Sequence, residues 1–443
     1  NFGKRGTDVR QKAMVIGGVF IIIGVMIFSH LLHDAPAAAT ADSLNVSDEG
    51  EGITDVLDFD ESLSEEEESD LDSIQTTSHE QTIIEVVTSF IRDSFSANSA
   101  LGDLNLIDVG STRFKEYMKN RQHLINLRRE SFSYSKRIDS FQLQVHDVDI
   151  RDDCAIVLGV SRESYSYSDS PDHHAASFVE YLAILSNTHS GWKIYWATSN
   201  DAYSKMLEEQ AGYCRVRGLI VPYSVGDDLY SDLRQIKDYS SETIFQKCNQ
   251  FVYAEFNMVR DNELENIEGE LGELRDNVTS TQSTGDFSRF AMRSYQNNWA
   301  LSRNPAWQDY SPPYGGGDCQ NYVSQIIKAG GAPFDDSGSH KWYWYSDSQR
   351  TASWTGVNSM QNYIRYNSGL GPNGIFGPSA SSLLTGDMVH IDWDNDGSYN
   401  HAVAIYNPGS SPTISGHTED CINKKLSDYP GAKQYIHFTH YGN

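Results

Sequence analysis

Residues 315–325 read GGGDCQNYVSQ, a glycine-rich approach that leads directly into a helical pattern. An apolar stripe at helical spacing follows, formed by Val323, Ile326 and Ile327. The pair Gly330 and Gly331 after it is typical of a helix end. The pattern places Cys319 on the first helical turn, where unpaired backbone N–H groups and the helix dipole favour a thiolate. The stretch therefore predicts a nucleophilic cysteine. Asp318 beside it opposes a negative sulfur, so a cationic partner is also required.

Two histidines downstream could supply that cation. His401 begins the run HAVAIY, and His417 lies in the run SGHT. Residues 402–406 and 413–417 are typical of strands, and the turn-forming residues between them predict a hairpin. A hairpin centred on Gly409 would place the two histidines directly opposite each other on one face of the sheet. A shift of one residue would place them on opposite faces.

Several further short motifs follow the cysteine in order: AGG at 329–331, HKWYWY at 340–345, GDMV at 386–389, NHA at 400–402 and GHT at 416–418. Together with the cysteine stretch, they resemble an amidase domain family often found in secreted bacterial proteins, which is similar to the papain-like NlpC/P60 and CHAP cysteine peptidases and amidases. The resemblance covers residues 286–443 and implies a papain-like (NlpC/P60-type) α+β domain. It implies that Cys319 is the nucleophile, His401 the base and His417 the polar residue that orients the base.

The same region contains residues that could contact a substrate. Gly317 and Asp318 precede the nucleophile, and Trp342 and Trp354 lie between nucleophile and base in the sequence. The resemblance suggests that some of these residues, with Trp393, wall the substrate groove. Core packing is the alternative for at least half of the aromatic residues.

Residues 392–397 read DWDNDG, which is the D-x-D-x-D-G opening of a calcium-binding loop. The twelfth position of such a loop is normally a glutamate that binds through both oxygens, and here it is Val403. The sequence therefore favours an acidic hairpin turn, and we expect neither a metal nor another cofactor.

The N-terminal residues carry signals for the cell envelope. Residues 13–32 are uncharged and apolar over the length that spans a bilayer, and the basic segment 1–12 predicts a cytoplasmic N-terminus. Residues 33–77 are strongly acidic and predict a disordered tether. A cleaved signal peptide is the alternative, and either case predicts extracellular C-terminal domains. The formal net charge of −27 argues against a nucleic-acid partner.

Between the tether and the amidase-like region, two patterns follow each other. Residues 78–204 combine helical spacing with four strand-like runs, which resembles the NTF2-like α+β fold in element order alone. Residues 205–285 are mostly helical, end in a polar linker and predict a stalk. Five cysteines occur without a CxxC pair, so neither a disulfide framework nor a zinc site is indicated: Cys154, Cys214, Cys248, Cys319, Cys421.

The sequence thus predicts a cell-envelope cysteine hydrolase, held by a single transmembrane helix. It would cleave an amide or peptide bond in peptidoglycan through thiolate attack and an acyl-enzyme. The alternative is a catalytically silent domain of the same fold that binds the cell wall or associates with a partner. A cysteine and two histidines at all three motif positions favour the enzyme.

Overall fold

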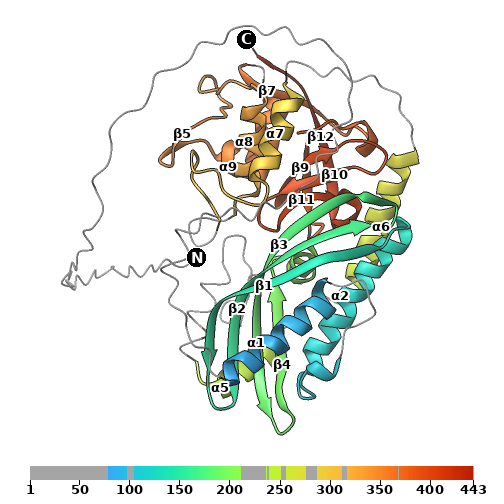
Figure 1. The fold of residues 1–443 in the computed structure, drawn as a ribbon. Helices are drawn as coiled ribbons and strands as arrows, with labels where there is room; N and C mark the ends of the chain where they lie inside the picture. The colour runs from blue at the N-terminus through green and yellow to red at the C-terminus, as the bar shows by residue number, and fades with distance from the viewer. Residues whose placement is uncertain are drawn as a thin grey trace, which may run out of the picture. The chain divides into compact units, whose positions relative to one another are not determined.

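The computed structural model describes residues 78–96, 104–210, 236, 239–250, 256–275, 287–311, 317–367 and 369–442, which lie within one compact unit, Ile74–Asn443 (Figure 1). In this part of the chain no helix combines the length and the apolar character that crossing a bilayer requires. The expected membrane helix 13–32 and the acidic tether 33–77 lie outside the described residues.

Two helices precede four long antiparallel strands, which is the element order that the sequence predicts for residues 78–204. The helical elements are α1 (Ser78–Phe90), the π-helical turn η2 (Ile91–Ser96), the 3-10 turn η3 (Leu104–Leu106), α2 (Thr112–Ser131) and, after the strands, α3 (Ala202–Glu209). The strands are β1 (Lys136–Ile150), β2 (Cys154–Tyr167), β3 (Ser170–Thr188) and β4 (Gly191–Ser199). β1 is an edge strand, and exposed and partly buried residues alternate along much of it, whereas β2 lies between two strands and is buried almost throughout.

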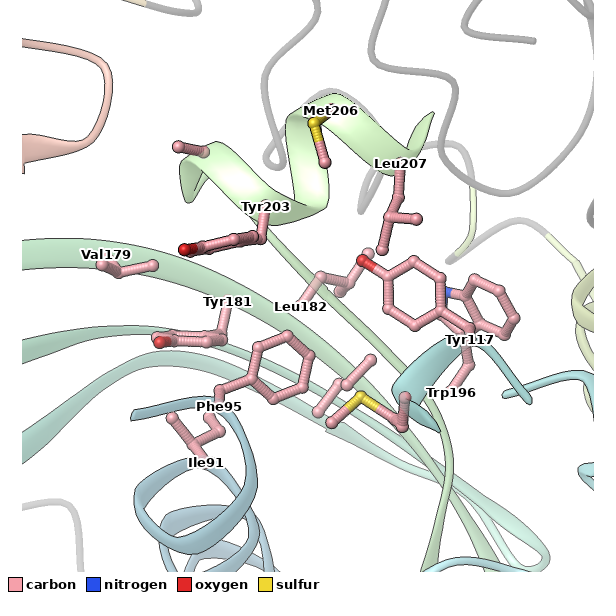
Figure 2. Packing of buried hydrophobic residues seen from close by; sticks show 14 of the residues in the cluster. Ile91, Phe95, Tyr117, Val179, Tyr181, Leu182, Trp196, Tyr203, Met206 and Leu207 are labelled. Carbon is pink, nitrogen blue, oxygen red and sulfur yellow. The ribbon is translucent and has the colours of Figure 1, made fainter. Parts of the chain in front are cut away.

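Aromatic side chains fill the space between these helices and the sheet (Figure 2). Phe95 meets Tyr181 edge to face with ring centroids 5.4 Å apart, and the Tyr117 ring lies 5.8 Å from that of Trp196. Met206 on α3 joins the same cluster. The cluster continues into the C-terminal part, where it includes Val403 and Tyr429, so the two parts share one apolar core.

The C-terminal part contains the elements expected around the cysteine. Its helical elements are α7 (Arg289–Trp299), α8 (Cys319–Ala329), α9 (Ala352–Thr355), α10 (Val357–Tyr366), η4 (Ala380–Ser382) and η5 (Leu426–Asp428). Its strands are β5 (Trp344–Ser346), β6 (Gln349–Arg350), β7 (Gly371–Phe376), β8 (Met388–Asp392), β9 (His401–Asn407), β10 (Thr413–Gly416), β11 (Asp420–Lys425) and β12 (Ala432–Gly442). The helix predicted to begin at Cys319 and to end before Gly330 is confirmed.

One sheet runs through both parts of the chain. Its strand order is β1-β2-β3-β11-β10-β9-β8-β12-β7, and β4 pairs with the other end of β3. The junction is the antiparallel pairing of β3 with β11, in which Ala176 lies opposite Ile422. The regions that the sequence suggests as successive modules therefore share backbone hydrogen bonds. The result is a mixed α+β structure with a large antiparallel sheet.

The helices after α3 pack against this unit. They include α5 (Ser241–Gln250) and α6 (Phe256–Arg275), and Figure 1 shows α6 beside α2. The fully buried Arg128 of α2 forms ion pairs with Glu263 and Glu270 of α6, the latter at 2.8 Å. Lys433 on β12 donates to Glu270 at 2.6 Å. The prediction of a stalk is therefore wrong for α6, because its acidic residues neutralise buried cations from both parts of the chain.

Candidate active site

Cys319 is the first residue of α8, and the helix reaches the sheet closely because its neighbours on β9 are small. Ala402 and Ala404 pack on the same apolar cluster as Val323 and Ile326. The cysteine side chain is 8% exposed. Burial raises the pKa of the thiol to about 11, although the backbone N–H groups of Ala402 and Gln320 act in the opposite direction. The expected helix-start thiolate is therefore overruled by desolvation, and Cys319 is a protonated thiol at neutral pH.

Gly317 adopts a backbone conformation with φ of +126°, which side chains other than hydrogen strongly disfavour. The glycine is thus required by the chain path into α8. Residues 312–316, the earlier part of that approach, lie outside the described residues.

Asp318, rather than the thiol, pairs with His417, one of the two histidines expected to supply a cation beside the sulfur. Its buried carboxylate accepts from Nδ1 of His417 at 2.6 Å and from Nδ2 of Asn321 at 2.7 Å. The guanidinium of Arg303 lies 3.6 Å away. Burial alone would raise the pKa of this carboxyl, but His417 and then Arg303 outweigh it and lower the pKa. Asp318 was expected to contact substrate. It is fully engaged inside the protein instead.

His417 is held on both sides. Its Nδ1 faces the Asp318 carboxylate, and its Nε2 lies 2.8 Å from the carbonyl oxygen of Trp299. Both neighbours offer acceptor oxygens, so each ring nitrogen faces an acceptor. The ring also stacks on Tyr322 with centroids 3.9 Å apart. His417 therefore orients Asp318 and the start of α8. The expectation that it orients His401 is wrong for this geometry.

His401 lies on the opposite face of the sheet from His417. Its ring packs between Trp393 and Tyr429, at centroid distances of 4.5 and 5.5 Å, and its Nε2 lies 3.1 Å from the Tyr429 hydroxyl. Burial, and then the positive charge of Lys205, lower the pKa of His401 to about 3, so the ring is neutral at neutral pH.

A one-residue register difference explains this separation. The expected pairing makes Gly409 the centre of the hairpin. In the structure Thr413 pairs with Asn407, but a bulge follows and Ile414 pairs with Ile405. From that point the register is shifted by one residue, which sends His401 and His417 to opposite faces.

A third histidine, His390 on β8, lies on the same face as α8. It pairs across the strands with Ala402, and its Nε2 lies 3.2 Å from the side-chain oxygen of Gln320, the residue after the cysteine. Its Nδ1 is buried without a partner. Burial lowers the pKa of His390 to about 3. No sequence motif marks His390, and the one available signal is its spacing of two from Met388, which places both residues on the same face of β8.

No histidine is hydrogen-bonded to Cys319 within the described ranges of the chain. The structure brings together Cys319, Asp318 and His417 at the start of α8. It does not bring His401 to the sulfur.

The three tryptophans expected at the substrate groove are buried. Trp342 and Trp354 have no exposed surface, and their rings lie 4.8 Å apart beneath α8. Trp354 donates to the side-chain oxygen of Asn321 at 2.7 Å, which fixes the first turn of the helix. Trp393 is buried beside His401 on the other face. Core packing is thus the correct interpretation for all three.

Two other tryptophans keep some exposed surface near the cysteine. Trp307 and Trp344 are half-buried, with ring centroids 5.1 Å apart, and Trp344 donates to the Tyr310 hydroxyl at 2.9 Å. Tyr310 is connected to the site because its backbone N–H donates to Asp318 at 3.0 Å. Trp344 lies in the aromatic stretch singled out in the sequence, whereas Trp307 has no distinguishing sequence pattern.

The candidate site lies within a region that is similar to a known protein family. Residues 286–441 match the model of the family described as "Putative amidase domain". A relative, uncharacterized protein YhbB of Bacillus subtilis, is 31% identical over 139 residues, which is 30% of this chain and 42% of the relative. Uncharacterized protein YjcM of the same organism is 23% identical over 221 residues, or 45% of this chain and 50% of the relative. This chain thus spans half or less of the relatives' lengths. No solved structure matches. The similarity of residues 286–441 to an amidase domain suggests amide hydrolysis.

Proposed function

We propose that the C-terminal part of this chain is a cysteine amidase or peptidase, that Cys319 is its nucleophile, and that its substrate is a peptide of the bacterial cell wall. The observation that carries the proposal is the placement of Cys319 as the first residue of α8, where backbone N–H groups of Ala402 and Gln320 stabilise negative charge on the sulfur. The match to an amidase domain family supports an amide as the bond that is cut.

The reaction follows from these groups. A neutral imidazole takes the thiol proton, the sulfur attacks the amide carbonyl carbon, and backbone N–H groups at the helix start bind the resulting oxyanion. The imidazolium then donates its proton to the leaving amine. Water attacks the thioester, and the acid product and the free thiol are regenerated.

His401 is the proposed base, because the resemblance assigns it and because it is neutral at neutral pH. His417 is not the proposed base, because both of its ring nitrogens are engaged, by Asp318 and by the carbonyl oxygen of Trp299. His401 and Cys319 are not in contact in the described conformation, so we infer that this conformation is a resting state. Substrate binding would have to rearrange the start of β9, lower the pKa of the thiol and bring the two groups together.

A peptidoglycan digestion tests the enzyme proposal. The full chain is incubated with purified peptidoglycan, and released fragments are identified by mass spectrometry. Cys319→Ala should reduce fragment release by at least ~10³-fold, and His401→Gln should reduce it strongly. Cys154→Ala, which removes a buried thiol of β2, is the matched control and should retain activity. Full activity in the Cys319→Ala protein would refute the cysteine mechanism. Loss of activity in His390→Gln but not in His401→Gln would move the base to β8.

One observation favours a second candidate function, a catalytically silent binding module. The thiol is buried, its pKa is raised, and none of the described histidines is hydrogen-bonded to it. The same digestion separates the two functions, because a module would sediment with peptidoglycan and release no fragment.

For the cell, we propose a single-pass membrane anchor at residues 13–32 with the amidase part outside the cytoplasm. The uncharged apolar run and the basic residues before it support this arrangement. A tether then keeps an acidic enzyme near an anionic wall that does not attract it electrostatically.

A further inference from the structure

The turn between β8 and β9 gathers three carboxylates. Asp392, Asp394 and Asp396 each offer one oxygen, and these oxygens all lie within 4.8 Å of one another. Asn395 and Gly397 take left-handed backbone conformations, with φ of +55° and +85°, which fold the segment back on itself. Like charges at such distances repel, so the arrangement is costly unless a cation lies among them.

Asp392 supplies an independent sign of a missing ligand. It is 3% exposed, and its Oδ2 accepts from the backbone N–H of Gly397 at 2.8 Å. Its Oδ1 is buried and has no hydrogen-bond partner. Over the described ranges of the chain, no lysine, arginine or histidine forms an ion pair with Asp392 or Asp396. A buried carboxylate oxygen without a partner carries the full cost of its desolvation.

We propose that Asp392, Asp394 and Asp396 bind a calcium ion. Calcium takes oxygen ligands at 2.3–2.6 Å, so oxygens on opposite sides of one ion are about 4.6–5.2 Å apart, and the observed spread fits one coordination sphere. The three residues are positions 1, 3 and 5 of the D-x-D-x-D-G pattern, and Gly397 at position 6 makes the sharp turn that the pattern needs.

The affinity should be modest. The twelfth position, Val403, is a buried residue inside β9 and offers no carboxylate, so backbone carbonyls and water must complete the shell. Sites with few charged ligands in extracellular modules bind calcium with dissociation constants of about 10⁻⁴–10⁻³ M. The absent glutamate made the sequence favour a plain acidic turn, whereas the structure adds the clustered oxygens and the buried Oδ1 of Asp392, which has no partner.

Bound calcium would act on the region of His401. Trp393 lies inside the loop, and its ring stacks on His401 at 4.5 Å. An ion that fixes Asp392 and Asp394 on either side of Trp393 therefore also fixes the surface against which His401 packs. This inference does not depend on catalysis, since it concerns metal binding alone.

Terbium luminescence and thermal unfolding test the site in the full chain. Tb³⁺ replaces Ca²⁺ in oxygen-rich sites and is sensitised by a nearby indole, here Trp393. Ca²⁺ should quench the emission with a midpoint of about 0.1–1 mM and should raise the unfolding temperature relative to the protein in EDTA. In the double variant Asp394→Asn/Asp396→Asn the Ca²⁺ concentration at the midpoint should rise at least ~10-fold, because two of the three charged ligands are lost.

The control removes the same charge from another exposed acidic turn. Asp152→Asn/Asp153→Asn, between β1 and β2, should bind Ca²⁺ as the wild type does. Asp396→Asn alone changes an exposed side chain, so it keeps the test valid if the double variant does not fold. A calcium midpoint above ~10 mM, an unchanged midpoint in both loop variants, or equal displacement by Mg²⁺ would each overturn the assignment to calcium.

Discussion

Alkylation of Cys319 in the free protein should rise steeply with pH. Cys319 is 8% exposed as a residue, and burial raises the pKa of its thiol to about 11, so the reactive thiolate is rare at neutral pH. The sequence, in contrast, predicts a thiolate that is stabilised by the helix start and a histidine. The two alternatives differ in the shape of the pH profile, which makes the profile a direct test of whether desolvation or the helix dipole dominates at this site.

The magnitude follows from the pKa. With a pKa of about 11, roughly one thiol in 10⁴ is ionised at pH 7 and one in 10² at pH 9. The alkylation rate should therefore rise about tenfold per pH unit over this range and continue to rise to pH 10. An exposed reference thiol has an ordinary pKa of about 8.5 and levels off earlier. A thiolate paired with an imidazolium would instead react at a nearly constant rate from pH 6 to 8.

The measurement uses iodoacetamide, acid quenching and peptide mass spectrometry, which resolves each cysteine separately. N-acetylcysteine in the same buffers is the reference, and circular dichroism confirms the fold at each pH. Cys319 should be labelled before Cys154, Cys248 and Cys421, which are less exposed. A flat profile, or a rate above that of the reference at pH 7, would refute the argument that burial controls this thiol.

Three further predictions concern stability and location. Arg128→Met should lower the free energy of unfolding in urea by about 3–5 kcal/mol, because two buried carboxylates lose their cation, whereas Arg137→Met, at an exposed pair, should change it by less than about 1 kcal/mol. His401 has its pKa lowered from 6.5 to about 3, so the stability it contributes as a neutral ring is present above pH 6.5 and is lost as the pH falls toward 3. Between pH 7 and 5 the free energy of unfolding of His401→Gln should therefore fall by about 2 kcal/mol less than that of the wild type. An equal fall in the two proteins would contradict the burial of His401 as a neutral ring. The full chain should sediment with membranes, resist high salt and dissolve in detergent. A mature N-terminus near Asp42 and protein in the medium would instead show that residues 13–32 are a cleaved signal.

Local sequence patterns predict much of the secondary structure. The start and end of α8 could be predicted because both depend on neighbours in sequence: a glycine-rich approach, an apolar stripe and a glycine pair. The predicted strands 402–406 and 413–417 agree with β9 and β10 within one residue at each end. Alternation of side chains within a strand is likewise a local property.

Pairings between distant segments could not be predicted in the same way. The bulge after Thr413 depends on how β10 fits between its two neighbours, and nothing in the turn before it specifies one extra residue. The sequence predicts that a histidine completes the activation of the Cys319 thiol, but the face of the sheet on which each histidine lies decides its partner, and the bulge controls that face. His417 pairs with Asp318 instead. The pairing of β3 with β11 joins segments more than 240 residues apart. The backbone groups at a strand edge can pair with another strand whatever its side chains, so no sequence motif identifies this partner.

The N-terminal part of the described chain is thus part of the surroundings of the site. Gln210 donates to the carbonyl of Trp393 at 3.0 Å, and the carboxylate of Glu419 accepts from the backbone N–H of Ala202 at 3.1 Å. These bonds hold the segments that carry Trp393, beside His401, and Glu419, just after His417. A fragment limited to residues 286–441 would lose them, and it would also expose the edge of β11 and the apolar face of β9. Although the amidase similarity begins at residue 286, the fold that surrounds its histidines begins before it.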